Sequence, residues 1–464
     1  MKQALRSAVS AAIILSFALS ALAQKTSVKP AILERNVRAE MNFLASDAMQ
    51  GRGSGSQFER VAAEYIGSQF MQFGLEPAGE NGGDGKPTYV QTVSVPGRET
   101  LTDLKFVMQE GVPPTYGRDF AALSIATKDI EGPIQKIKAG DAATKGSIVL
   151  YKPAADAKLS ELQPVFAKFR QDGAAAIIIS ETKEIRDNWD AIVAQKLGVS
   201  RRGSLLVFSE RSFDGLMSGP DGINVKFAGQ FAPGVNTSTW NAIGKITGSD
   251  STLGSQVILI SSHLDHLGVR QNAPTEDKIF NGADDDASGS VAVMELARVL
   301  SSSAKPKRTV YFVCFGSEEV GGFGANYFVT NLPFPKEKLV ANLEFEMIGR
   351  PDSAVKPEEL WLTGFERSNL GSELARRGAK LVQDPHPDQN FFQRSDNYTL
   401  ARQGIIAHTV SSFGLHKDYH QASDEVRTID FEHMTRSINS MVSPIQWLVN
   451  SSFVPAWVEG KRPS

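Results

Sequence analysis

Cysteine is almost absent from this chain of 464 residues, which contains only Cys314. One cysteine cannot form an internal disulfide, so a fold held together by disulfides is excluded. Cys314 lies in the apolar run 309–315, where a free thiol behaves as a small buried hydrophobe. A chain of this length can bury a large core, and we expect that core to provide the stability.

An excess of positive charge is also missing, since the formal net charge is −3. A chain without a basic field gives no sign of nucleic-acid binding, and we expect no such partner. The hydrophobic fraction of 41% and the charged fraction of 22% are ordinary for a globular protein. None of the seven histidines precedes His263, so imidazole chemistry belongs to the second half of the chain.

Long apolar runs are confined to the N-terminus. Lys2 and Arg6 precede the apolar run 11–19, and Ala-Leu-Ala at 21–23 ends it. This order of charged, apolar and small residues predicts a signal peptide over residues 1–23, and the run is shorter than the roughly 20 residues of a membrane span. We therefore expect an exported protein, periplasmic or secreted, that has no membrane association after cleavage.

Residues 98–235 have a different pattern of apolar and turn residues from the rest of the chain. Short apolar runs at 148–151, 174–179 and 204–208 alternate with turn residues and one helix-like stretch. The region has no histidine and no charged cluster with ligand spacing. We predict an inserted smaller α/β or β-rich domain without chemistry of its own.

Before it, the Gly/Ser loop 51–56 lacks the lysine of a phosphate-binding loop and is predicted to start a helix.

From about residue 236, apolar runs alternate with helical patterns. The expected strands are 256–262, 309–315, 339–346 and 404–410, and the expected helices are 288–300, 367–377 and 430–449. Such alternation predicts an α/β fold with a mostly parallel central sheet and helices on both faces. In these folds ligands bind beyond the carboxyl ends of the strands.

Several histidines and carboxylates fall at those strand ends. His263 ends one expected strand, with Asp265 two residues later, and Asp284, Asp285 and Asp286 begin the next helix. Adjacent carboxylates repel each other, so a cation or a helix N-terminus must compensate them. One Asp is expected to face a metal while Ser288 or a neighbouring Asp caps the helix. Imidazole and carboxylate groups without thiolate form a ligand set that suits zinc.

Two glutamate pairs and a histidine cluster complete the candidates. Glu318 and Glu319 follow the strand 309–315, and one of them can bind metal while the other acts as general base. Glu344 and Glu346 share one strand face, and Glu346, nearer the strand end, is the better ligand candidate. His420 with Asp424 repeats the pattern of a ligand supported by an acid, and His416 is its rival.

Together these motifs resemble the co-catalytic di-zinc aminopeptidases, whose relatives include the glutamate carboxypeptidases and glutaminyl cyclases. The matching segments, in the family's order, are His263-Leu-Asp265, Gly282 to Gly289, Glu318-Glu319-Val-Gly, Glu346-Met347 and Tyr419-His420. The resemblance implies a zinc exopeptidase-like fold, with residues 24–97 and 236–464 forming the catalytic domain. It also implies that the insert 98–235 is similar to a protease-associated domain.

The resemblance assigns roles residue by residue. Two Zn²⁺ ions would be bridged by Asp285, the first completed by His263 and Glu346 and the second by Glu319 and His420. Glu318 would be the general base, and Asp265 would orient His263. The family usually has Asp at the position of Glu346, which puts the geometry of that site in question. His266 could compete as a ligand, although its spacing favours a supporting role.

The expected function is that of an exported metallo-aminopeptidase that releases N-terminal amino acids from peptide substrates. Carboxypeptidase, dipeptidase and glutaminyl cyclase activities on the same fold are alternatives, and a single arginine such as Arg350 or Arg394 could read a substrate carboxylate. A phosphoesterase and an inactive binding module resembling the transferrin receptor are further alternatives. The oligomeric state is not predicted.

Overall fold

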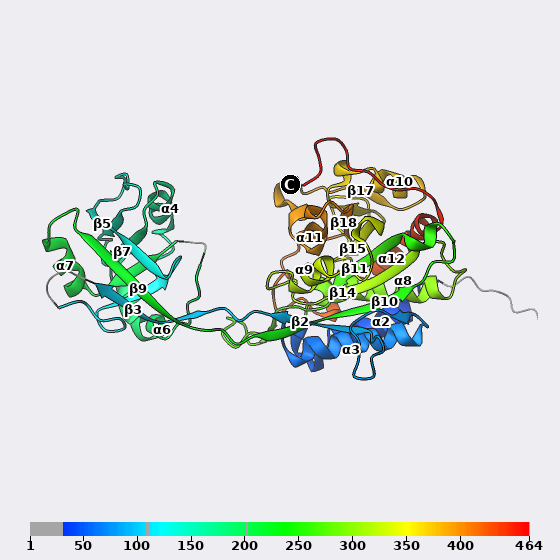
Figure 1. The fold of residues 1–464 in the computed structure, drawn as a ribbon, viewed down its shortest axis with the longest axis horizontal. Helices are drawn as coiled ribbons and strands as arrows, with labels where there is room; N and C mark the ends of the chain where they lie inside the picture. The colour runs from blue at the N-terminus through cyan, green and yellow to red at the C-terminus, as the bar shows by residue number, and fades with distance from the viewer. Residues whose placement is uncertain (1–30, 108–111, 201–202, 464) are drawn as a thin grey trace, which may run out of the picture. The chain divides into compact units, whose positions relative to one another are not determined.

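The computed structural model describes residues 31–107, 112–200 and 203–463. The predicted signal peptide at 1–23 therefore lies outside the described residues. The chain forms two compact units: one takes the chain up to Val95 and again from Ser238, and the other is Pro96–Thr237 (Figure 1). Within the described ranges, no helix combines the length and apolarity needed to cross a bilayer.

The first unit is built on a nine-stranded sheet with the order β1-β10-β14-β11-β15-β18-β16-β17, and β2 also pairs with β10. The central strands β14, β11, β15 and β18 are parallel, as predicted. Antiparallel pairing of β10 with β14 and of β16 with β18 flanks them. The strand bounds are β1 Glu76–Pro77, β2 Val90–Val95, β10 Thr237–Ile246, β11 Val257–His263, β14 Thr309–Phe315, β15 Leu339–Phe345, β16 Leu360–Leu362, β17 Leu381–Gln383 and β18 Ala407–Ser411.

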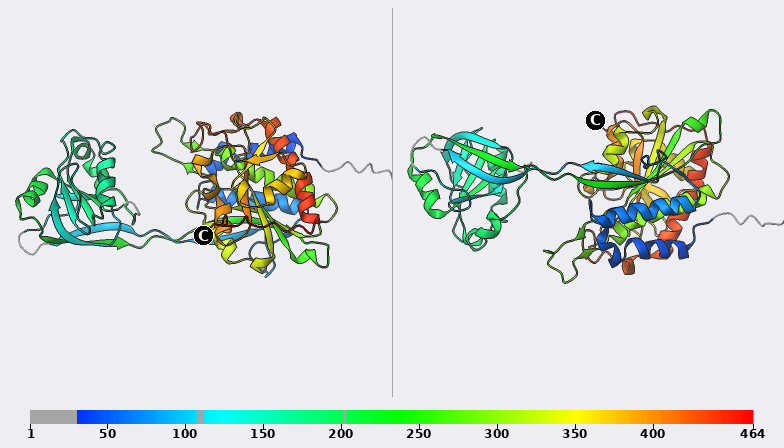
Figure 2. Two further views of the ribbon diagram at one scale, coloured as in Figure 1. Left: turned by 90° about the horizontal axis from the view of Figure 1, so that it is seen from above. Right: turned by 60° about the horizontal axis from the view of Figure 1, so that its bottom comes forward.

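Helices cover both faces of this sheet, because successive strand side chains point to opposite sides. On β11, Ile258 and Ile260 belong to one hydrophobic core, and Val257 and Leu259 to another. The first core includes buried side chains of α2, α3, α8, α10 and α12, and the second those of α9 and α11. Helices flank the sheet in the ribbon views of Figure 2. The helix bounds are α2 Glu34–Leu44, α3 Gln57–Gln72, α8 Gly289–Ser301, α9 Phe323–Thr330, α10 Leu370–Arg376, α11 Asp396–Arg402 and α12 Phe431–Asn450. The predicted two-sided α/β layering is confirmed.

The Gly/Ser loop before α3 starts a helix, as predicted. The Ser56 side chain accepts hydrogen bonds from the backbone N–H groups of Phe58 and Glu59, which satisfies two donors at the helix N-terminus. In the same loop, the fully buried Arg52 donates to the carbonyl oxygens of Leu264 and Gly282 over 2.8 and 2.9 Å. This side chain joins the N-terminal segment to the two segments that carry the histidine and aspartate motifs.

The second unit contains a seven-stranded sheet with the order β3-β9-β5-β6-β7-β8-β4. Strands β5, β6, β7 and β8 are parallel, and hydrophobic cores lie on both faces of the sheet. The bounds are β3 Thr100–Val107, β4 Phe120–Ser124, β5 Asp129–Lys136, β6 Ile148–Tyr151, β7 Ala176–Ser180, β8 Leu205–Phe208, β9 Asn224–Ala232, α4 Gln163–Gln171, α5 Lys183–Asp187, α6 Trp189–Val193 and α7 Glu210–Ser218. This unit is thus a smaller α/β domain.

Candidate metal centre

The candidate residues gather where the parallel strands of the first unit end. His263 is the last residue of β11 and lies opposite Phe315, the last residue of β14. Glu318 and Glu319 follow β14 within four residues, and Glu346 directly follows β15. Because neighbouring parallel strands end at one edge of the sheet, these side chains converge, as the strand-end rule predicts.

The first group of converging atoms comes from His263, Asp285 and Glu346. The Nε2 atom of His263 lies 3.2 Å from Asp285 Oδ1 and 4.0 Å from Glu346 Oε1. All three potential ligand atoms lie within 4.8 Å of one another. An imidazole nitrogen and two carboxylate oxygens at this spacing can hold one metal ion.

The second group shares Asp285 and adds Glu319 and two histidines. The Nδ1 atom of His266 lies 2.7 Å from Glu319 Oε1 and 3.8 Å from Asp285 Oδ2. The Nε2 atom of His420 lies 3.2 Å from both Asp285 Oδ2 and Glu319 Oε2. Asp285 therefore contributes one carboxylate oxygen to each group, which is the arrangement of a bridging ligand.

The donor atoms of both groups fit a metal better than they fit one another. Among the described residues, the buried atoms His263 Nε2, His266 Nδ1, Asp285 Oδ2 and Glu319 Oε1 form no hydrogen bond of good geometry, although His266 Nδ1 and Glu319 Oε1 lie 2.7 Å apart. Leaving buried polar atoms unpaired is costly, and the aligned nitrogen and oxygen donors are those that zinc takes. The residues present thus fit a metal centre.

The backbone at 282–289 brings Asp285 into the site through two close approaches. Gly282 has φ 58°, and a Cβ there would lie 2.2 Å from the carbonyl oxygen of Asp285. A Cβ at Gly289, the first residue of α8, would lie 2.1 Å from the Phe345 carbonyl oxygen. Only glycine fits at both positions, and the segment can pack against the end of β15. The Asp285–Asp286 peptide bond within it is cis.

The three consecutive aspartates point to three different partners. Asp286 Oδ1 accepts from the backbone N–H of Gly289 over 2.9 Å and caps α8. Asp284 Oδ1 accepts from the Gly349 N–H over 2.7 Å, and its Oδ2 lies 2.9 Å from His416 Nε2. Only Asp285 faces the metal groups. The expectation that one Asp faces the metal while a neighbour caps the helix agrees with this geometry, and His416 lies on the side of Asp284.

Asp424 supports the backbone of the bridging residue Asp285 and not the nearby His420. Its carboxylate accepts hydrogen bonds from the backbone N–H groups of Asp284 and Asp285, each over 3.1 Å. Among the described contacts, none joins Asp424 to His420, the partner predicted from sequence. The acid therefore fixes the chain that carries Asp285. Burial, with the nearby charge of Asp284, raises the pKa of Asp424 to about 8.

Asp265 contacts its predicted partner His263 and also holds a second segment. Its Oδ1 lies 3.7 Å from Nδ1 of His263, too far for a hydrogen bond, while its backbone carbonyl oxygen lies 3.2 Å from the same nitrogen. The carboxylate instead accepts from the backbone N–H groups of Glu318 and Glu319, and from Ser54 Oγ over 2.5 Å. The carbonyl is the group that orients the His263 ring.

Glu318 lies beside the metal groups without belonging to either. Burial, then the negative charges of Asp396, Glu346 and Glu319, raise its pKa well above the ordinary value, although His263 opposes them. Burial likewise raises the pKa of Glu346 to about 8. Bound cations counteract such shifts, because they favour the ionised carboxylates. Its position next to Glu319 keeps Glu318 a candidate for proton transfer.

His266 and Arg52 are the site residues that sequence reasoning weighed too lightly or missed. His266 is fully buried and approaches Glu319 more closely than His420 does. The sequence marked it as a rival ligand with a more favoured supporting role, and its place beside Glu319 keeps it a candidate ligand. Glu344, the rejected candidate, accepts hydrogen bonds from Ser395, Asn397 and Thr409 and is held away from the metal groups.

Comparison with known proteins agrees with this geometry. Residues 241–443 match the model of peptidase family M28. This segment, less than half of the chain, is similar to the M28 domain. This domain contains both groups of candidate ligands, from His263 to His420, while residues before 241 supply Arg52 and Ser54. The fold of the first unit is therefore that of a zinc-peptidase family, as the resemblance implied.

Individual relatives support the same family. The chain is similar to leupeptin-inactivating enzyme 1 of Streptomyces exfoliatus, with 36% identity over 231 residues that cover 47% of this chain and 50% of that protein. An aminopeptidase of Pseudomonas aeruginosa is 34% identical over 119 residues, or 25% of this chain and 19% of that protein. The chain spans half or less of the length of these curated relatives. A solved zinc aminopeptidase of Bacillus subtilis has 18% identity and a TM-score of 0.53, covering 93% of this chain and 98% of that one, which shows the fold.

Proposed function

We propose that the protein is a metallo-aminopeptidase that uses two zinc ions to release N-terminal amino acids from peptides. The observation that carries the proposal is the carboxylate of Asp285, which contributes one oxygen to each of two adjacent ligand groups. A shared carboxylate is what a two-metal hydrolase requires. The M28 match and the names of the relatives support the reaction class.

The ligand assignment follows from the two groups. His263 and Glu346 would complete one zinc site, and Glu319 with His420 the other, with Asp285 between them; His266 is an additional candidate for the second site. When bound, zinc lowers the pKa of a bound water and polarises the scissile carbonyl group. Asp265 and Asp424 hold the backbone segments from which Glu319 and Asp285 reach the site.

Glu318 is the proposed general base and then general acid. Its carboxylate takes a proton from the attacking water and later gives it to the leaving amine. The backbone N–H of Glu318 is fixed by the Asp265 carboxylate over 3.0 Å, which limits the positions that the base can adopt.

The test combines metal analysis with matched substrates. The mature protein should contain about two zinc ions by plasma emission and should hydrolyse leucyl anilide but not N-acetyl-leucyl anilide. Glu318→Gln should keep the metal and lose about 10²–10⁴-fold in rate, the usual contribution of a general base. Hydrolysis of the blocked substrate at an equal rate would overturn the aminopeptidase assignment. Cyclisation of N-terminal glutamine without hydrolysis would favour the cyclase alternative.

We also propose that the protein is exported, and that residues 96–237 are a protease-associated type of domain. Support for export is the charged, apolar and small-residue order of the first 23 residues. The mass of the protein purified from culture medium or periplasm should correspond to a chain that begins at Gln24. An intact N-terminus in the cytoplasmic fraction would contradict export.

A further inference from the structure

Two arginines lie beside the candidate active site, and their environments differ. Arg350 donates to Asp418 Oδ2 over 2.8 Å and to Asp424 Oδ1 over 3.4 Å, and its Nε lies 3.7 Å from Asp284 Oδ2. Its side chain is only 15% exposed. Three carboxylates neutralise this guanidinium, so Arg350 has no charge to offer a substrate.

Arg394 makes no ion pair with any residue in the described ranges. Its guanidinium donates to the Tyr419 hydroxyl over 3.3 Å and lies over the rings of Phe391 and Tyr419, with centroid distances of 4.9 and 5.8 Å. The residue is exposed to solvent. Aromatic faces hold an arginine without neutralising its charge. Arg394 is therefore an oriented cation that still lacks an anion.

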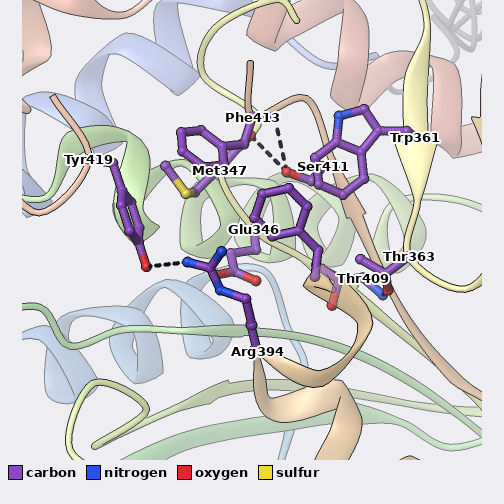
Figure 3. A pocket seen from close by; sticks show the side chains of 10 residues that line it. Glu346, Met347, Trp361, Thr363, Arg394, Thr409, Ser411, Phe413 and Tyr419 are labelled. Carbon is purple, nitrogen blue, oxygen red and sulfur yellow. Dashed lines mark hydrogen bonds between the residues drawn. The ribbon is translucent and has the colours of Figure 1, made fainter. Parts of the chain in front are cut away.

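Arg394 lines a pocket next to the first metal group. Apolar walls come from Met347, Trp361, Phe391 and Phe413, and Glu346 of the metal group lies in the same pocket. Figure 3 shows the guanidinium directed to the Tyr419 hydroxyl and entering the space that Glu346 also borders. A group bound here lies close to the bond that the proposed reaction cleaves.

We propose that Arg394 binds a carboxylate of the substrate. This inference rests on the proposed aminopeptidase function. A planar guanidinium pairs with a carboxylate through two parallel hydrogen bonds, and the rings of Phe391 and Tyr419 hold this guanidinium in place. The carboxylate has two possible sources: the side chain of an N-terminal acidic residue, or the C-terminus of a dipeptide.

Two pairs of substrates, each differing in one carboxylate, distinguish these sources. The first pair is glutamyl and glutaminyl anilide, and the second is Leu-Ala and its C-terminal amide. In the wild-type protein, the carboxylate member of one pair should have a kcat/KM at least about tenfold higher, mainly through KM, as expected for a charge-assisted hydrogen bond. The pair that shows the preference identifies the source.

Arg394→Gln should abolish that preference, so that the variant hydrolyses both members of the pair with equal kcat/KM. Arg394→Lys should retain part of it, since lysine keeps the charge but not the paired geometry. Arg402→Gln is the matched control: Arg402 lies over the Tyr398 ring at 5.6 Å and does not line the pocket, so its variant should keep the full preference.

The outcomes separate this inference from the proposed function. The protein could hydrolyse leucyl anilide but show equal rates within both substrate pairs, or keep a preference in Arg394→Gln. Either result overturns the role of Arg394 and leaves the aminopeptidase function standing. If no amide is cleaved, the proposed function fails, and calorimetric titration with glutamate against glutamine and with Leu-Ala against its amide tests Arg394. Equal affinities within both pairs would then overturn the inference.

Discussion

The carboxylate of Asp265 accepts a hydrogen bond from the backbone N–H of Glu318 over 3.0 Å. The same carboxylate accepts from Glu319 N–H over 3.4 Å. One acid just beyond β11 thus fixes the turn after β14 that carries both the proposed general base and a proposed ligand. The nearby His263 ring is oriented through the backbone of Asp265, so a single residue connects three elements of the site.

Replacing this acid should disturb the base more than the metal. In Asp265→Asn the amide nitrogen cannot accept a hydrogen bond. At least one of the bonds from the backbone N–H groups of Glu318 and Glu319 is therefore lost. We expect kcat to fall by about 10–100-fold, the usual effect of losing a group that supports metal ligands, with metal content close to wild type. Ser54→Ala, which removes only the hydroxyl bound to Asp265, is the control and should change kcat by less than about threefold. Loss of metal in Asp265→Asn would contradict this role.

Glu346 should be required for metal at the first site. Glu346→Gln keeps the shape but removes the charge that binds a cation, so we expect that site to lose about tenfold or more in zinc affinity, measured by competition with a chelator. Glu344→Gln is the matched control, two residues earlier and within β15. Because Glu344 contacts Ser395, Asn397 and Thr409, its variant should lower stability and leave zinc affinity unchanged. Equal affinities in wild type and Glu346→Gln would exclude Glu346 as a ligand.

Arg350 should stabilise the fold around Asp424. In Arg350→Met three carboxylates lose their common partner, and breaking a buried ion pair on one side costs about 3–5 kcal/mol. We expect the free energy of unfolding in denaturant to fall by about 3 kcal/mol. Arg350→Lys, which keeps the charge, should lose less. A variant as stable as wild type would show that Asp284, Asp418 and Asp424 do not depend on this arginine.

The buried His408 should make stability sensitive to acid. Burial lowers its pKa to about 4, whereas an unfolded histidine titrates near about 6.5. Between these values the unfolded chain binds a proton that the folded chain does not, so stability is complete above about pH 6.5 and is lost as the pH falls toward 4. The shift corresponds to about 3 kcal/mol.

The measurement is the free energy of unfolding of wild type and His408→Gln at pH 7 and pH 4.5, both without metal. The variant loses the hydrogen bonds to Thr363 and Ser368 and should be less stable at pH 7. Its loss between the two pH values should nevertheless be smaller than that of wild type. An equal or larger loss would show that His408 is not the source of the acid sensitivity.

Sequence reasoning performed best where hydrophobic periodicity is strong. The strand expected at 309–315 is β14 with the same bounds, and the helix expected at 430–449 is α12, Phe431–Asn450. The first is a continuous apolar run that is buried along its whole length, and the second is a long segment with a helical apolar pattern. The antiparallel margins of the sheet were not predicted, because pairing between β10 and β14 joins residues far apart in sequence.

The supporting contacts of the site could not be assigned from spacing. Asp265 and Asp424 each lie near a histidine in sequence, and both were expected to support that histidine. Each carboxylate instead binds backbone N–H groups of another segment. His266 was ranked below His420, although folding brings it to 2.7 Å from Glu319. Distance along the chain does not show which way a buried side chain turns.

The sequence by itself determined the kinds of groups available to this protein: imidazoles and carboxylates placed at strand ends, with no thiolate among them. These follow from residue identity and from the rule that parallel strands deliver their ends to one edge. Only the tertiary structure decided which carboxylate is shared, which acids hold backbone, and which of two arginines keeps its charge free. Those outcomes depend on the competition among buried polar groups for partners, and that competition is settled only when distant segments pack together.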